Sequence, residues 1–148
     1  MKFAIGADHG AVDLKEEVKL VLKEFPNINV VDIGTFSHDP VDYPDIAKKV
    51  AEKITSGECE RGIVLCGTGI GISIAANKIN GIRCALCSDV FSAKMARRHN
   101  DANMLAMGGR VLGVGPAGEI VRAFVEGKFE GGRHERRVKK IMDLEGKQ

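Results

Sequence analysis

The residues best suited to chemistry form a glycine-rich segment that starts with a cysteine. The segment reads Cys66, Gly67, Thr68, Gly69, Ile70 and Gly71. Glycines at alternate positions between a strand and a helix leave backbone N–H groups free to converge on an anion, and the helix dipole adds to the attraction. We therefore favour an anion-binding site or an oxyanion hole, a set of donors that stabilises a negatively charged oxygen.

Two other interpretations of the glycine segment stay open. One is a tight turn that binds no ligand. The other is a nucleotide site, since Asp89 lies at a suitable distance downstream to meet a ribose. The dinucleotide fingerprint, however, requires a third glycine at position 72, where this chain has Ile72, and the Lys-Ser/Thr pair of a phosphate-binding loop is absent.

Cys66 stands directly before the glycines. A free thiol titrates near about 8.5, and a position at a helix N-terminus makes thiolate available near neutral pH. A thiolate beside an oxyanion hole suits nucleophilic attack or removal of a proton next to a carbonyl. The alternative is a small buried apolar residue at the end of a strand, which is a common place for cysteine.

Histidines and arginines supply the other candidate groups. His9 follows Asp8, and His99 opens a polar run before a predicted strand, which a capped helix end would also explain. Arg133 and Arg137 are one helical turn apart, a spacing that can clamp a phosphate but is also typical of a solvated basic face. None of the histidines forms an H-x-H or H-E-x-x-H pattern, so no metal site is predicted.

Apolar runs alternating with helical patterns must position these residues. The expected strands are 3–7, 28–33, 62–66, 83–87 and 104–107, continuous runs typical of strands buried on both faces of a parallel sheet. Amphipathic stripes over 14–22, 46–54 and 120–125 predict helices between them. The fold class is therefore α/β, a doubly wound, Rossmann-like, five-stranded parallel sheet with helices on both faces.

The unusual residues cluster at the carboxyl ends of the expected strands, where such folds bind ligands. They are Asp8-His9-Gly10, the glycine segment from Cys66, Ser88-Asp89 and Gly108-Gly109-Arg110. Cys84 and Cys87, three apart on a strand, face opposite sides and are interpreted as structural cysteines. A basic helix from Arg133 onward carries an apolar stripe that we expect to reach a neighbouring subunit.

Composition limits the class of protein. The 148 residues form one domain, 1–148, with 44% apolar residues, 28% charged residues and a net charge of +2. That charge is too small to predict binding to nucleic acid or to an anionic membrane, and no apolar run is long enough for a membrane span. The start lacks a signal-peptide pattern, so we expect a cytoplasmic protein whose four cysteines are reduced.

Together the motifs resemble those of the type B ribose 5-phosphate isomerases. The matching blocks are Asp8-His9-Gly10, Val41-Asp42-Tyr43-Pro44-Asp45, Cys66 to Ser73, Ala75-Ala76-Asn77-Lys78, His99 to Asn103, and Gly131-Gly132-Arg133-His134-Glu135-Arg136-Arg137. They cover almost the whole chain in order, with weaker similarity over 25–29 and 113–128. The wider family includes allose 6-phosphate and galactose 6-phosphate isomerases, which are the alternative functions; a nucleotide-binding module is a distant one.

The resemblance implies a cofactor-free aldose–ketose isomerase that interconverts ribose 5-phosphate and ribulose 5-phosphate in the non-oxidative pentose phosphate pathway. Cys66 would move a proton between C2 and C1 of the open-chain sugar. N–H groups of residues 67–71 would stabilise the enediolate oxygen. His99 would be the acid that opens the furanose ring, with Thr68 and Asp8 near the ring oxygen and hydroxyls.

The resemblance also implies the substrate contacts. Asn100 would hold a sugar oxygen and Tyr43 would line the pocket. The phosphate would be bound by His9, Arg110, Arg133 and Arg137. Some of these would come from the neighbouring subunit of a homodimer or a dimer of dimers with shared active sites.

Overall fold

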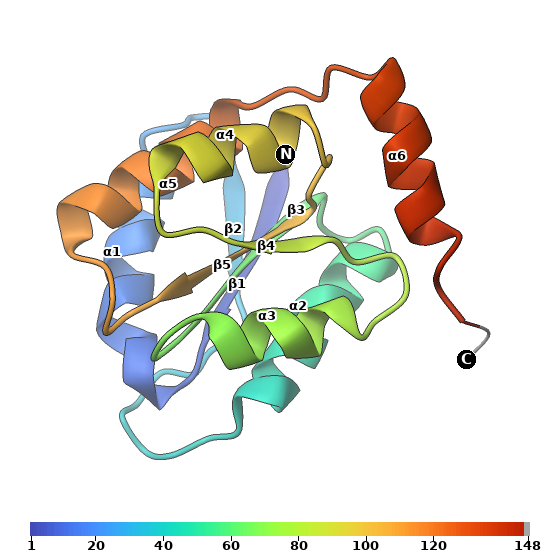
Figure 1. Ribbon diagram of the computed structural model, residues 1–148. Coiled ribbons are helices and arrows are strands. Elements are labelled where there is room, and N and C mark those ends of the chain that lie inside the picture. Colours follow the sequence, from blue (N-terminus) through green and yellow to red (C-terminus); the bar gives the residue numbers. More distant parts are fainter. Residues whose placement is uncertain (147–148) are drawn as a thin grey trace.

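Five parallel strands form the centre of the computed structural model, which describes residues 1–146; the last two residues of the predicted domain lie outside the described residues. The strands are β1 (Lys2–Ala7), β2 (Asn29–Asp32), β3 (Arg61–Cys66), β4 (Cys84–Leu86) and β5 (Met104–Gly108). Their order in the sheet is β2-β1-β3-β5-β4, with every neighbouring pair parallel (Figure 1). The predicted five-stranded sheet is confirmed, and each strand begins and ends within one residue of its predicted position.

Helices cover both faces of this sheet, as the doubly wound fold requires. One face carries α1 (Val12–Leu22), α4 (Val90–Arg98) and α5 (Val114–Glu126), and the other carries α2 (Tyr43–Thr55) and α3 (Ile70–Asn77). The chain also has a short 3-10 helix, η1 (His9–Ala11), and a last helix, α6 (Arg133–Met142). Within residues 1–146, no helix is both long enough and apolar enough to cross a membrane.

The continuous apolar runs fill two cores because successive strand residues point to opposite faces. On β1, Phe3 and Ile5 pack under α1 and α5, whereas Ala4 packs under α2 and α3. All three side chains are fully buried. Strands of this kind carry no polar alternation, which is why the apolar runs in the sequence predicted them correctly.

The sheet has a topological switch point between β1 and β3. From β1 the chain crosses to β2 on one side, and from β3 it continues to β4 and β5 on the other. The segments that follow β1 and β3 therefore leave the same edge of the sheet in opposite directions, which is where folds of this kind bind ligands. Asp8 and Cys66 stand at these two carboxyl ends.

A buried ion pair anchors the segment that leads from β2 to α2. Lys15 is fully buried, and its Nζ lies 2.8 Å from both carboxylate oxygens of Asp32. Lys19 and the N–H of Gly34 also donate to this carboxylate, each at 2.9 Å. Burial opposes ionisation of Asp32, but the hydrogen bonds from the two lysines outweigh it and lower the pKa of the carboxyl group. The pair fixes the start of the segment that ends at Tyr43.

The last helix packs partly on its own chain. Figure 1 shows α6, in red, standing at one side of the molecule. Its Met142 Sδ accepts a hydrogen bond from the Arg83 guanidinium at 3.2 Å, whereas Ile141 is 45% exposed. The predicted apolar stripe is therefore only partly covered within one chain, and its contact with a neighbouring subunit stays a prediction.

Candidate active site

The glycine segment forms a turn that contacts the sulfur of Cys66. The N–H of Gly69 donates a hydrogen bond to Cys66 Sγ at 3.1 Å, and the N–H of Ile70 donates to Thr68 Oγ1 at 3.2 Å. Helix α3 begins at Ile70, so the sulfur lies beside the positive end of a helix dipole. Cys66 is only 4% exposed, so its thiol is buried rather than on the surface.

The glycines are required because neighbouring groups touch this turn. Gly69 has φ +80°, and a Cβ on it would lie 2.8 Å from the carbonyl carbon of Met107. A Cβ on Gly71 would lie 2.6 Å from the ring of Tyr43. Such distances are closer than real side-chain contacts allow, so the turn is packed between β5 and the start of α2.

Two N–H groups of the turn have internal partners and three do not. The N–H groups of Gly69 and Ile70 are used within the turn. Within residues 1–146, those of Gly67, Thr68 and Gly71 have no acceptor. Of the donors expected from the sequence, 67–71, these are the three that no group in the described residues uses.

The end of β1 adds a carboxylate and a histidine. Asp8 is 7% exposed, and its Oδ1 accepts from the N–H of Gly10 at 2.9 Å, which caps the 3-10 helix. His9 Nδ1 accepts from the N–H of Val41 at 3.2 Å. A ring nitrogen that accepts carries no proton, so the neutral ring holds its proton on Nε2 and presents a donor there.

Arg110 completes this group of residues. Its backbone N–H donates to the carbonyl of Gly67 at 2.9 Å. Its guanidinium lies over two glycines, 3.3 Å from the Cβ position of Gly67 and 3.6 Å from that of Gly10. We call the residues gathered here the strand-end half-site: Asp8, His9, Tyr43, Cys66, Gly67, Thr68, Gly69, Ile70, Gly71 and Arg110.

The remaining candidates lie together at the other edge of the sheet. His99 follows the last residue of α4, and the polar run after it leads into the beginning of β5. The carbonyl of Asn103 accepts from the N–H of Gly62 at 2.9 Å, which fixes this run at the amino end of β3. We call His99, Asn100, Arg133 and Arg137 the strand-start half-site.

The two half-sites are separated by the length of a strand. Cys66 ends β3, whereas the run after His99 pairs with the beginning of β3. At about 3.3 Å per residue, a six-residue strand spans roughly 17 Å. Within one chain the structure therefore brings the two sets of predicted residues into two groups and does not bring Cys66 and His99 together.

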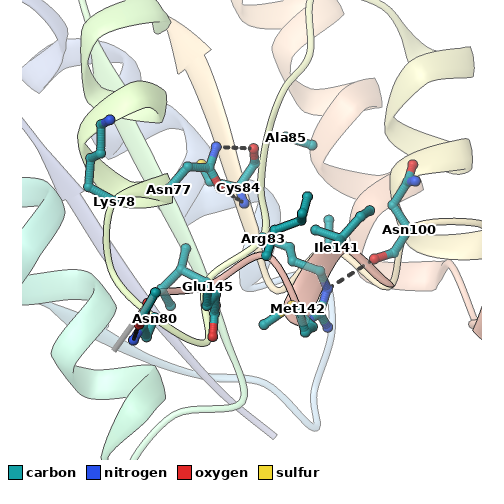
Figure 2. Close-up of a pocket in the computed structure, with 14 residues that line it drawn as sticks. Asn77, Lys78, Asn80, Arg83, Cys84, Ala85, Asn100, Ile141, Met142 and Glu145 are labelled. Carbon is teal, nitrogen blue, oxygen red and sulfur yellow. Dashed lines mark hydrogen bonds between the residues drawn. The ribbon is translucent and has the colours of Figure 1, made fainter. Parts of the chain in front are cut away.

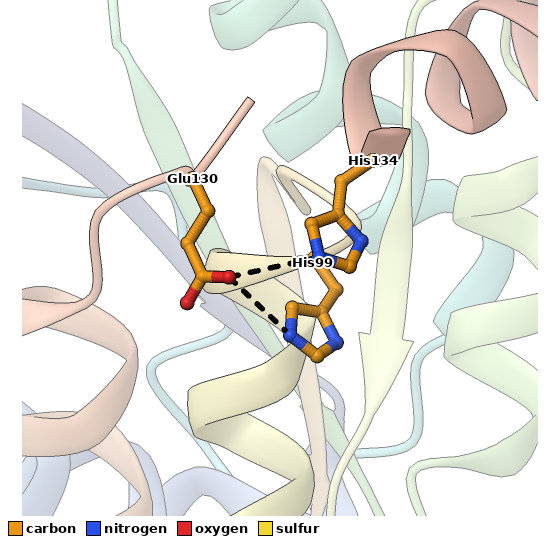
Figure 3. Close-up of side chains that lie close together, drawn as sticks. All are labelled: His99, Glu130 and His134. Atoms are coloured by element: carbon orange, nitrogen blue, oxygen red, sulfur yellow. Dashed lines mark ion pairs between the residues drawn. The ribbon is translucent and has the colours of Figure 1, made fainter. Parts of the chain in front are cut away.

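Two residues at the strand-start half-site were not predicted. His134 stacks on His99 with ring centroids 4.0 Å apart and planes 9° from parallel, and Glu130 Oε1 lies 3.6 Å from Nε2 of each ring (Figure 3). His134 stands in the same block as Arg133 and Arg137, which was a usable signal. No pattern marks Glu130, because its partners come from two separate helices.

A groove adjoins the strand-start half-site. It has a volume of about 700 Å³ and lies between the end of α6 and the loop that joins α3 to β4 (Figure 2). Asn100 lies at its rim, and the carbonyl of Asn100 accepts from Arg83 Nε at 3.1 Å. Its apolar lining includes Ile82, Ile141, Met142 and Leu144.

The contacts weaken the nucleotide-site alternative and support the structural interpretation of Cys84 and Cys87. Both carboxylate oxygens of Asp89 accept from Ser92 at 2.7 Å, as the cap of α4, so this side chain is engaged rather than held out to a ribose. Cys84 and Cys87 are free thiols, and burial raises their pKa values to about 12 and about 11. Neutral buried thiols agree with the structural interpretation of this pair.

The fold and the thiol beside a glycine turn are those of an enzyme class that isomerises sugars. A ribose/galactose isomerase family model matches residues 3–141, and the chain belongs to this family. Ribose-5-phosphate isomerase B of Escherichia coli is 47% identical, over 97% of this chain and 96% of the relative. D-erythrulose-4-phosphate isomerase of Pectobacterium atrosepticum is 45% identical, over 95% and 93%. The structure of Clostridium thermocellum ribose-5-phosphate isomerase B superimposes with a TM-score of 0.95, at 53% identity and 98% and 97% coverage.

The packing around Gly69 yields a test with a matched control. Gly69→Ala combines a left-handed backbone with a clash against Met107, whereas Gly57 has φ +82° and no neighbour within 4 Å of its Cβ position. We expect Gly69→Ala to lower the free energy of unfolding by about 1–3 kcal/mol more than Gly57→Ala, the usual cost of overpacking. Urea titration measures both. Equal losses would show that the turn has room to move.

Proposed function

We propose that the protein interconverts ribose 5-phosphate and ribulose 5-phosphate through an enediolate, without a metal or a nucleotide. The observation that carries the proposal is the Cys66 thiol set against a glycine turn with three available N–H donors. Membership in the ribose/galactose isomerase family supports it. This isomerisation needs a base, stabilisation of a negative oxygen and correct placement of the substrate. The chain offers a group for each need.

In the proposed reaction Cys66 is the base. Its thiolate takes the proton from C2 of the open-chain aldose, and the electron pair moves to the carbonyl oxygen at C1. N–H groups of Gly67, Thr68 and Gly71 donate to the enediolate while it carries the charge. The hydroxyl at C2 passes its proton to the negative oxygen at C1, and the thiol returns the first proton to C1 as the carbonyl forms at C2.

The other residues open the sugar ring and hold the substrate. His99 gives a proton to the furanose oxygen, with Asp8 and Thr68 near the ring oxygen and hydroxyls. Tyr43 lines the pocket, and Asn100 holds a sugar oxygen. The phosphate is bound by the Nε2–H of His9 and by Arg110, Arg133 and Arg137, because charged donors to phosphate give strong hydrogen bonds.

The proposal requires two copies of the chain for each complete site. A sugar phosphate is far shorter than the roughly 17 Å of strand between the half-sites, so no single chain presents both to one molecule. If a second copy brings its strand-start half-site to the strand-end half-site, the site is complete, and two-fold symmetry produces two such sites. We therefore propose a homodimer, or a dimer of dimers, with shared active sites.

An exposed apolar surface supports the choice of interface. Ile70 and Ile74 are one turn apart on α3 and are 52% and 57% exposed. Leu86, on the edge strand β4, is 39% exposed and lies against Gly69, and Phe91 at the start of α4 is 71% exposed. An apolar surface of this kind on an edge strand needs a cover. We call these four residues the β4 patch.

The sugar and the location complete the proposal. Allose 6-phosphate or galactose 6-phosphate is the alternative substrate, because the matching family model covers ribose and galactose isomerases alike. An assay of ketose formation with ribose 5-phosphate and allose 6-phosphate side by side separates the two substrates.

A cytoplasmic location is supported by the four cysteines, all of which are free.

Replacing the base tests the mechanism. We expect Cys66→Ala to lower kcat for ribose 5-phosphate by at least about 100-fold, the scale of a lost general base. Binding of the substrate should survive, because the phosphate contacts are intact, and isothermal titration measures it. Cys59→Ala, which removes another buried thiol, is the control and should keep near-normal kcat. A Cys66→Ala enzyme with near-normal turnover would refute the assignment.

Breaking the proposed interface tests the shared site. Ile74 and Leu20 are both 57% exposed, but only Ile74 belongs to the β4 patch. We expect Ile74→Lys to yield folded monomers in analytical ultracentrifugation and to lose most of the activity, because the two half-sites of one chain lie too far apart to form a complete site. Leu20→Lys, on α1, should stay dimeric and active. A folded Ile74→Lys monomer with normal turnover would contradict the proposal.

A further inference from the structure

Glu130 and His134 have no role in the reaction proposed above, although both contact His99. Glu130 lies in the segment between α5 and α6, and His134 is the second residue of α6. As Figure 3 shows, both rings turn Nε2 toward the same carboxylate oxygen. The second nitrogen of His99, Nδ1, points away from Glu130 in this view.

Hydrogen bonds to Arg98 hold Glu130 in place beside the two rings. Its N–H donates to the carbonyl of Arg98 at 3.0 Å, and Arg98 Nε donates to its Oε2 at 2.6 Å. One carboxylate oxygen is thus held by the residue next to His99, and the other faces the two imidazoles. The hydrogen bond from Arg98 lowers the pKa of Glu130, so the group is a carboxylate at neutral pH.

His134 is suited to stack on the His99 ring as a neutral imidazole rather than to carry a charge. It is 7% exposed, and desolvation, together with the nearby His99, Arg133 and Arg137, lowers its pKa. A neutral imidazole lies flat on His99, and this contact fixes the plane of the His99 ring. His99 faces Glu130 and His134, and the charged groups next to these two residues are Arg98, Arg133 and Arg137.

We propose that Glu130 and His134 are positioning residues for His99: the carboxylate faces Nε2–H, the stacked ring sets the plane, and Nδ1 is left to exchange a proton with the sugar. The proposal rests on the proposed function of His99 as the ring-opening acid. In that step the pair of electrons of the C1–O4 bond goes to O4, which takes the proton from Nδ1. The anomeric hydroxyl forms the C1 carbonyl and gives its proton to water.

A shared metal ion is a poorer explanation of the same cluster. The ligand atoms of His99, Glu130 and His134 lie within 4.8 Å of one another, and these side-chain types bind zinc. An imidazole binds a metal in the plane of its ring, but these rings are stacked and parallel to within 9°. One ion cannot lie in two separate parallel planes, so the geometry favours stacking.

The test compares a substrate that must open with one that is already open. Ribose 5-phosphate is a furanose, whereas ribulose 5-phosphate stays acyclic because its C5 oxygen carries the phosphate. We expect Glu130→Gln to lower kcat for ribose 5-phosphate at least about 10-fold, which is a fraction of the rate enhancement that a general acid supplies. The rate of ribulose 5-phosphate consumption should fall much less. The alkaline limb of the aldose profile should move to lower pH, because a protonated ring is disfavoured without the carboxylate.

Three further variants separate positioning from folding. Glu119→Gln, at an exposed ion pair with Arg122, is the control and should match the wild type. His134→Phe keeps a flat ring and should retain the aldose rate, whereas His134→Ala should lose it at least about 10-fold. The proposal would be overturned if Glu130→Gln lost as much activity with ribulose 5-phosphate as with ribose 5-phosphate. It would also be overturned if His134→Phe were as inactive as His134→Ala. A wild type that isomerises no aldose phosphate would instead refute the proposed function itself.

Discussion

The common direction of the five strands governs the rest of this molecule. Because every strand is parallel, all residues that follow a strand gather at one edge of the sheet and all that precede a strand gather at the other. Cys66 belongs to the first set, and His99 belongs to the second. A chain built this way can hold the proposed base beside its N–H donors, and the proposed acid near Arg133 and Arg137, but it cannot bring the two together by itself.

The strand-end half-site depends on close packing as much as on polar groups. Gly69 takes a left-handed backbone against Met107, and this lets its N–H donate to Cys66 Sγ. Gly71 receives the ring of Tyr43. These contacts leave no room for a Cβ, so the turn is closely packed on both sides. Donors held in one place before the substrate arrives stabilise a developing charge without reorganisation.

Much of the fold was predictable because it rests on local patterns. Apolar runs such as 62–66 located the strands, and the glycines after Cys66 located the turn. The order of the sheet, with β4 outside β5, was not predictable from these patterns, and neither was the β4 patch that follows from it.

The part of the site that sequence reasoning missed depends on distant contacts. Glu130 joins His99, 31 positions earlier, only because Arg98 holds its carboxylate and because α6 returns His134 to the end of α4. Likewise, the motif blocks assigned Cys66 and His99 to one active site. Only the direction of the strands shows that the two residues lie at opposite edges of the sheet. Spacing along a chain predicts contacts within an element, not contacts between elements.

Mixing two inactive variants tests the shared site most directly. Cys66→Ala and His99→Ala proteins are combined in equal amounts, subunit exchange is confirmed by mass spectrometry, and conversion of ribose 5-phosphate is measured. In a mixed dimer one site lacks both residues and the other has both, so about a quarter of wild-type activity should return when exchange is complete and random. If exchange is complete and no activity returns, Cys66 and His99 do not meet across an interface, and the account is wrong.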